Sequence, residues 1–190
     1  MAPPRFGSLT LLHVFAGPFP TVQGTQALVA TTCRLLANNG HDVHLLTYAH
    51  SGFEREEPFT VHRIPDLPRF ASERSGPDHR KLALDLSLAL RCRHLVEKLR
   101  PSLVHAHHYE ALLASALADP LRLTPRVLHL HALMEPELQT YVRPSLARLM
   151  RAVGAWMDGS LPFLADRVVA LDGDGRDAVV RRGFPEGRVV

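Results

Sequence analysis

The sequence predicts an α/β fold, a Rossmann-like, mostly parallel sheet of about seven strands with helices on both faces. Short apolar runs typical of buried parallel strands alternate with longer segments whose apolar residues recur at three- and four-residue spacing. Near the N-terminus a strand, a helix and a strand follow one another, which is the order of a βαβ unit. Because no linker divides the 190 residues, we expect one domain spanning residues 1–190.

The first unit is expected to run from a strand at Leu9–Phe15 to a second strand at Val43–Tyr48. Gly24 and Thr25 open the helix between them, and the Thr25 hydroxyl is expected to cap that helix by accepting from a backbone N–H. Asn39-Gly40 should end it, because these residues tolerate a positive φ.

The rest of the chain continues the alternation. Phe59–Ile64 is expected to be a third strand, and the proline-containing segment 66–78 a mobile loop. Later strands are expected at Leu103–Ala106, Val127–His131, Arg167–Leu171 and from Arg188 onward, and helices at Arg80–Arg100, Tyr109–Ala118, Pro144–Asp158 and Asp174–Arg182.

Composition excludes several classes of protein. The formal net charge is only +3, and the arginines are spread without a block, so no nucleic-acid partner is expected. Cys33 and Cys92 lie in apolar helical patterns, which indicates buried free thiols in a reducing compartment. The N-terminus lacks a signal-peptide pattern, and no apolar run reaches the roughly 18 to 20 residues of a spanning helix. We therefore expect a cytoplasmic protein.

Contact with the inner face of a membrane is an additional hypothesis. It is motivated by the segment Arg143–Met157, in which Trp156 and other apolar residues are interleaved with arginines. The alternative is a helix that packs on the sheet and turns a solvated basic face outward.

Two predicted strands end in closely spaced histidines. They are His105, His107 and His108 in one segment, and His129 and His131 in the other. The carboxyl ends of parallel strands face the crevice where ligands bind, so His131 is the first candidate for a catalytic residue. As a neutral imidazole it would exchange a hydrogen bond with a sugar hydroxyl or a phosphate. His105 and His129 lie deeper and are expected to be satisfied core residues.

A metal centre is a second interpretation of the same residues. Strand alternation puts both histidine pairs on one side, so four imidazoles could converge. Against this, the histidines of each strand lie at different depths, and no cysteine or carboxylate completes a familiar ligand spacing. We expect no metal. Asp172 and Asp174 resemble a metal-binding acid pair, yet the sequence after them departs from an EF-hand, and we expect helix caps instead.

The first strand–helix junction is a candidate anion site. Neither G-x-G-x-x-G nor G-x-x-x-x-G-K-[ST] occurs, which argues against a dinucleotide-binding Rossmann domain and a P-loop ATPase. Free N–H groups at Gly24 and Thr25 could still bind a phosphate. A tight turn with an ordinary cap remains an open alternative.

Five segments together resemble the N-terminal domain of glycosyltransferase family 4, a family of retaining enzymes with the GT-B fold. The resemblance covers nearly the whole chain and rests on the order of F-P-T-V-Q-G-T-Q, N-G-H-D-V, P-S-L-V-H-A-H-H, V-L-H-L-H and A-D-R-V-V-A-L-D, at residues 19–26, 39–43, 101–108, 127–131 and 165–172.

The resemblance implies an acceptor-binding half of an enzyme that transfers a sugar from a nucleotide diphosphate sugar to an acceptor with retention, without a metal cofactor. Gly24 would approach the donor phosphates or the acceptor, and His131 would reach the transferred sugar. The other residues expected to bind substrate or phosphate are Thr25, His107, His108 and Glu135. Thr25 stands where the family usually has a second glycine, and Asp172 where it has a serine or threonine.

The resemblance also implies a C-terminal donor-binding domain that these 190 residues do not contain. We expect the chain alone to be inactive, because positioning and charge stabilisation need both halves. Two alternatives stay open: a non-catalytic sugar- or nucleotide-binding module, and part of a sugar-nucleotide epimerase that shares the GT-B fold.

Overall fold

The structure is a computed structural model that describes residues 7–20, 24–49, 56–66 and 79–190. Six strands within these residues form one parallel sheet in the order β3-β2-β1-β4-β5-β6. This is the strand order of a doubly wound sheet, whose direction of growth reverses between β1 and β4. The predicted α/β class is confirmed. The strands are β1 (Thr10–Pro18), β2 (Asp42–Tyr48), β3 (Thr60–Arg63), β4 (Leu103–His107), β5 (Arg126–Leu130) and β6 (Arg167–Ala170).

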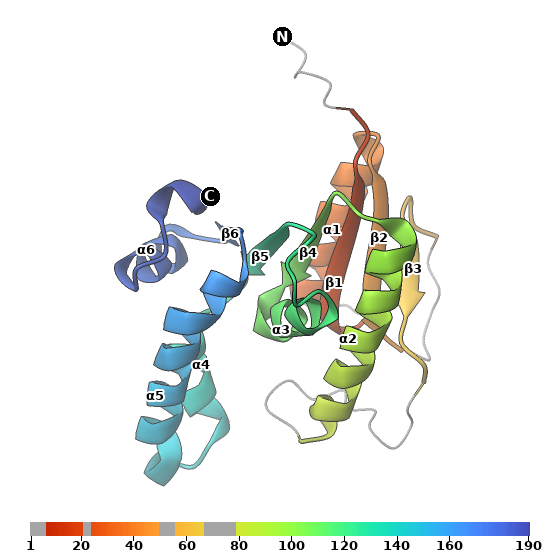
Figure 1. The fold of residues 1–190 in the computed structure, drawn as a ribbon. Helices are drawn as coiled ribbons and strands as arrows, with labels where there is room; N and C mark the ends of the chain where they lie inside the picture. The colour runs from red at the N-terminus through yellow and green to blue at the C-terminus, as the bar shows by residue number, and fades with distance from the viewer. Residues whose placement is uncertain (1–6, 21–23, 50–55, 67–78) are drawn as a thin grey trace.

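Helices cover both faces of this sheet, with α1 on one face and α2 and α3 on the other (Figure 1). No helix in the described part of the chain is both long and apolar enough to cross a membrane. The predicted mobile loop lies almost entirely outside the described residues. The helices are α1 (Gly24–Asn38), α2 (His79–Leu99), α3 (His108–Ala118), α4 (Met134–Leu138), α5 (Pro144–Ser160) and α6 (Gly173–Arg181), with 3-10 turns at Gln139–Tyr141, Leu161–Leu164 and Glu186–Arg188.

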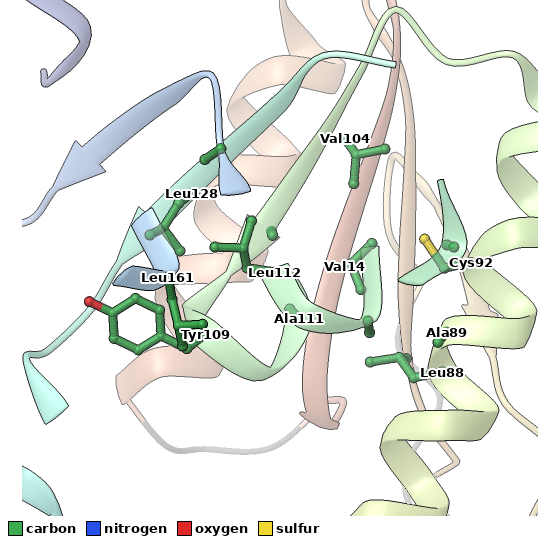
Figure 2. Packing of buried hydrophobic residues seen from close by; sticks show 14 of the residues in the cluster. Val14, Leu88, Ala89, Cys92, Val104, Tyr109, Ala111, Leu112, Leu128 and Leu161 are labelled. Carbon is green, nitrogen blue, oxygen red and sulfur yellow. The ribbon is translucent and has the colours of Figure 1, made fainter. Parts of the chain in front are cut away.

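Two apolar clusters hold the helices to the sheet. On the α2–α3 side, Val14 and Val104 pack near Cys92 of α2, and Leu112 of α3 packs near Leu128 of β5 (Figure 2). The α1 side is formed by a second cluster: Leu11, Phe15, Val43 and Leu45 with Val29 and Cys33 of α1. Both cysteines are buried free thiols, as predicted, and burial raises the pKa of each to about 12, so neither is a nucleophile at neutral pH.

The predicted seventh strand is reduced to a single bridge. Val189 pairs in parallel with Val168 of β6, and the Val190 N–H donates to the Val168 carbonyl at 2.9 Å. The Glu186–Arg188 turn immediately precedes this pair. Within the described residues the sheet therefore has six strands, with this bridge in place of the predicted seventh.

The loop predicted to open at Glu135 is a helix. It is α4, and Pro136 fits there because a proline is tolerated in the first turn, where the N–H groups have no intrahelical partner. Asp158 of α5 supplies the missing acceptors: its Oδ1 accepts from Met134 N at 2.9 Å and its Oδ2 from Glu135 N at 2.8 Å. The α4 start is thus fixed by a buried carboxylate from another helix, which the local sequence does not reveal.

Of the two predicted helix N-caps, Asp172 is confirmed and Thr25 is not. Asp172 is the N-cap of α6, and its Oδ1 accepts from Gly175 N at 2.7 Å, as predicted. Thr25 is not a cap, because α1 begins one residue earlier, at Gly24. At the other end of α1, Gly40 adopts φ 90°, which confirms the predicted stop at Asn39-Gly40.

Candidate functional site

Five histidines from three adjacent strands form a continuous row, which we call the histidine row: His13 of β1, His105 and His107 of β4, and His129 and His131 at the end of β5. Register explains it. His13 pairs with His105, and His107 pairs with His129, so alternation along each strand puts all five side chains on the same face. The histidines of each strand do lie at different depths, yet His107 and His129 are direct neighbours across the two strands, so imidazoles of both strands converge.

Ring nitrogens link three members of the histidine row. His13 Nδ1 lies 3.0 Å from His107 Nε2, and His107 Nδ1 lies 3.3 Å from His131 Nε2. The rings of His105 and His107 stack with centroids 4.7 Å apart, and those of His129 and His131 lie at the same distance. A chain of imidazoles therefore runs from the buried first strand to the partly exposed His131.

Burial keeps the histidine row uncharged. It lowers the pKa of His13 to about 3, with the neighbouring His129 as a second cause, and it lowers the pKa values of His105 and His107 well below the ordinary value. The pKa of His131 is also lowered to about 3, first by burial and then by His129 and His108. At neutral pH these rings each carry one N–H and one lone pair.

Some of these imidazoles are not satisfied by the protein. Among the described residues, His13 Nε2, His105 Nε2 and His129 Nδ1 are buried without a hydrogen-bond partner. The prediction that His105 and His129 are satisfied core residues is therefore wrong. Their neighbours on this face are mainly other imidazoles, and each such ring offers only one donor and one acceptor.

His108 marks the junction between β4 and α3. Its backbone has φ 73°, a left-handed conformation that costs a non-glycine residue energy. Its Nδ1 lies 2.8 Å from Glu110 Oε2. Burial lowers the pKa of His108, but the hydrogen bond and charge of Glu110 outweigh it, so the net pKa is raised. Its ring centroid is 6.3 Å from that of His131.

A pocket of about 130 Å³ opens beside His131, between the loop after β5 and the start of α6. Of the residues predicted to bind substrate, His131 is the one that lines it. Asp172 and Asp174 also line it, so the pocket presents an imidazole and carboxylates to a ligand. Such groups hydrogen-bond to hydroxyls and disfavour anions. The remaining lining residues are Leu130, Ala132, Leu133, Pro136, Leu171 and Gly175.

The other predicted site residues lie in three places. His107 and His108 join His131, whereas Gly24 and Thr25 lie on a different element, at the start of α1. Gly24 is exposed and a Cβ there would meet nothing within 4 Å, so close packing is not what requires glycine. Glu135 contacts two arginines: Arg151 Nε donates to its Oε1 at 3.1 Å, and Arg182 donates to its Oε2.

Sequence reasoning missed two residues that organise this site. His13 was only part of an apolar strand, and nothing local to it shows that it will face His105 and His107. The sequence pattern predicts Asp158 only as the last residue of a helix, yet it is buried and also accepts from the Tyr109 hydroxyl at 3.0 Å. Both roles arise from contacts that are distant in sequence, which only the strand order and helix packing define.

Comparison with known proteins gives a family and a fold. The model of Glycosyltransferase Family 4 matches residues 22–190. A search of curated protein sequences finds no significant match. Among solved structures, sucrose-phosphate synthase from Thermosynechococcus elongatus superposes with a TM-score of 0.70 at 14% identity, over 96% of this chain and 47% of that one.

Two further structures show the same arrangement at low identity. HepE from Anabaena, in complex with UDP and glucose, has a TM-score of 0.61 at 14% identity, over 96% of this chain and 43% of its own. UDP-N-acetylglucosamine 2-epimerase from Rickettsia bellii has a TM-score of 0.54 at 13% identity, over 96% and 44%. At this identity the likeness shows the fold alone, one half of a GT-B structure. The chain spans less than half the length of the structures it matches.

Proposed function

The chain belongs to Glycosyltransferase Family 4, and we propose that it is the acceptor-binding half of an enzyme that transfers a sugar from a nucleotide diphosphate sugar with retention. The fold of half a GT-B structure supports this proposal. So does the complex of HepE with UDP and glucose, a protein of the same fold. The donor-binding half would be a second domain, and this chain alone would bind without turnover.

The observation that carries the proposal is the neutral imidazole of His131 beside a small pocket that Asp172 and Asp174 also line. The pocket lies at the carboxyl end of the sheet, where open α/β folds bind their ligands. His107 holds the ring through Nε2, which restricts its orientation and tautomer. One His131 nitrogen can then exchange a hydrogen bond with a sugar hydroxyl, while Asp172 and Asp174 are placed to accept from others.

The donor diphosphate would be met by α1 rather than by α6. Both helices begin at the carboxyl end of a strand, but α1 has no acidic residue in its first turn, whereas α6 carries Asp172 as its cap and Asp174 beside it. Anions favour a helix N-terminus without such charges. We therefore assign Gly24 and Thr25 to the phosphates, and we propose that the transfer step itself requires no metal.

Replacing His131 tests this assignment. In the enzyme completed by its second domain, His131→Ala should lower kcat about 100-fold, within the range that one positioned imidazole contributes. His94→Ala is the matched control, because His94 is exposed on α2, away from the histidine row. The measurements are steady-state transfer from UDP- and GDP-sugars and the melting temperature of each variant.

Three outcomes contradict the proposal. If His131→Ala lowers the melting temperature as severely as it lowers kcat, His131 is a structural residue. Sugar transfer by residues 1–190 alone would show that a second domain is dispensable. An epimerised donor without a transferred sugar would identify an epimerase. Inversion of the anomeric configuration in the product would remove the retaining mechanism only.

We also propose that the enzyme acts in the cytoplasm and touches the inner face of the membrane through α5. Leu146, Leu149 and Trp156 are 48%, 57% and 64% exposed, which leaves an apolar stripe beside Arg148 and Arg151. The chain should co-sediment with vesicles that contain anionic lipid, and Trp156→Ala with Leu149→Ser should reduce the bound fraction several-fold. Vesicle binding that does not depend on salt concentration or on the charge of the lipid would contradict this proposal, and so would the absence of binding.

A further inference from the structure

Three histidines at the open end of the histidine row surround a common point. One ring nitrogen from each of His107, His129 and His131 lies within 4.8 Å of the others. The ring centroids form a nearly regular triangle, 5.3 Å from His107 to His129, 4.7 Å from His129 to His131 and 5.5 Å from His107 to His131. Three imidazoles that converge in this way are a common set of ligands for a transition metal.

One separation in this triad already suits a metal. A tetrahedral zinc ion about 2.0–2.1 Å from each nitrogen places its ligand nitrogens about 3.3–3.4 Å apart. His107 Nδ1 and His131 Nε2 are 3.3 Å apart, so an ion could replace the proton that these nitrogens share. His129 supplies the third nitrogen, and its Nδ1 has no partner within the described residues.

His13 favours the tautomer of His107 that can bind a metal through Nδ1. When Nδ1 of His107 binds a metal, its proton resides on Nε2, which lies 3.0 Å from His13 Nδ1 and can donate to it. Metal-binding histidines nearly always donate their second N–H to such a partner, which fixes the tautomer. Each ring keeps one proton in this arrangement, so binding needs no deprotonation of a charged histidine. Imidazoles that are neutral at pH 7 are the form that ligates.

A second triad exists, but it is less suited to an ion. His13, His105 and His107 also have nitrogens within 4.8 Å of one another, yet His13 and His107 have no exposed surface and Nε2 of His105 is buried. The triad that includes His131 is partly exposed and adjoins the pocket, which provides a path for entry and an open coordination position.

We propose that His107, His129 and His131 bind a transition metal ion, with Zn²⁺ as the expected occupant, and that His13 orients His107 from behind. This goes beyond the proposed sugar transfer, which needs no metal. A metal on Nε2 of His131 would replace the hydrogen bond of that nitrogen to His107 and leave Nδ1 facing outward from the triad, so the ion would fix the orientation of His131 beside the pocket rather than take part in the transfer.

The test is Zn²⁺ binding to the untagged, metal-free chain. Calorimetry should find one Zn²⁺ per chain, and Co²⁺ should give the intense visible bands of a tetrahedral site. His131→Ala, at the partly exposed end of the row, should weaken Zn²⁺ binding at least about 100-fold, because it removes one of three ligands. His94→Ala should bind as the unmodified chain does.

Separate variants distinguish the two triads. His105→Asn leaves the proposed ligands intact and should retain Zn²⁺ binding within a few-fold. Loss of binding in His105→Asn with retention in His131→Ala would overturn the assignment in favour of the buried triad. Absence of Zn²⁺ binding and of Co²⁺ bands at millimolar metal would overturn the site altogether. Neither readout involves catalysis, so both outcomes are independent of the proposed enzyme activity.

Discussion

Acidification should unfold this chain, with a midpoint between about pH 4 and pH 5.5 when metal is removed by a chelator. The cause is the histidine row, whose imidazoles are buried in the neutral form and have lowered pKa values. In the unfolded chain each histidine regains a pKa near 6.5, so below that pH the unfolded state binds more protons than the folded state. The free energy of unfolding must therefore fall as the pH decreases.

The expected slope is steep because several groups act together. Each strongly shifted histidine removes about 1.4 kcal/mol per pH unit below its unfolded pKa, so four give a slope on the order of 5 kcal/mol per pH unit. A domain is typically stable by about 5–15 kcal/mol, so this is enough to unfold it. His108 opposes the trend, because Glu110 raises its pKa, but it is one group. Glu110, with its pKa lowered to about 2, adds to the loss only below about pH 4.5.

Urea unfolding at pH 7, 6.5, 6 and 5.5 measures this slope directly. His131→Gln removes one titrating imidazole and should lower the slope by about 1.4 kcal/mol per pH unit. His94→Gln, on the exposed surface of α2, should leave it unchanged. A free energy of unfolding that varies by less than about 1 kcal/mol between pH 7 and pH 5.5 would show that the histidines are not buried in the neutral form.

The histidine row also shows where sequence reasoning was sufficient. Apolar runs, helical spacing and turn residues predicted the α/β class and the β4 and β5 segments, because these depend on local patterns. Alternation also placed His105 with His107, and His129 with His131, on one side of their strands. The contribution of His13 could not be predicted, since it depends on β1 being inserted beside β4, the point at which the order of the sheet reverses.

The same distinction explains the loop after β5. A proline two residues into the segment suggested a break, and local propensity alone supports that interpretation. The helix α4 forms because Asp158, buried in α5, accepts from two of its N–H groups. The position of Glu135 follows from this contact, and so does its pairing with Arg151 and Arg182. Long-range hydrogen bonds of this kind leave no signal in the sequence around residue 135.

Gly154→Ala should destabilise the chain by about 3 kcal/mol, the upper end of the cost of overpacking. A Cβ at Gly154 would lie 2.3 Å from the Met134 carbonyl oxygen and 2.6 Å from the Glu135 nitrogen. Both are backbone atoms, and Asp158 accepts from the Glu135 N–H, so no side-chain rotation can relieve the contact and α4 and α5 must separate. For a domain of this size the melting temperature should fall by roughly 6–12 °C.

Gly159→Ala is a control in the same helix, α5, for which the change in the free energy of unfolding is expected to have the opposite sign. The nearest atom to a Cβ there is Cδ of Arg182 at 3.9 Å, an ordinary contact, so the higher helix propensity of alanine should leave the chain unchanged or stabilise it by up to about 1 kcal/mol.

Because Met134 follows His131 by three residues, separating α4 from α5 also displaces the rim of the pocket. Gly154→Ala should therefore weaken Zn²⁺ binding as well as lower stability, whereas Gly159→Ala should change neither for the worse. Equal melting temperatures for the two variants would show that α4 and α5 are not packed as closely as the structure places them.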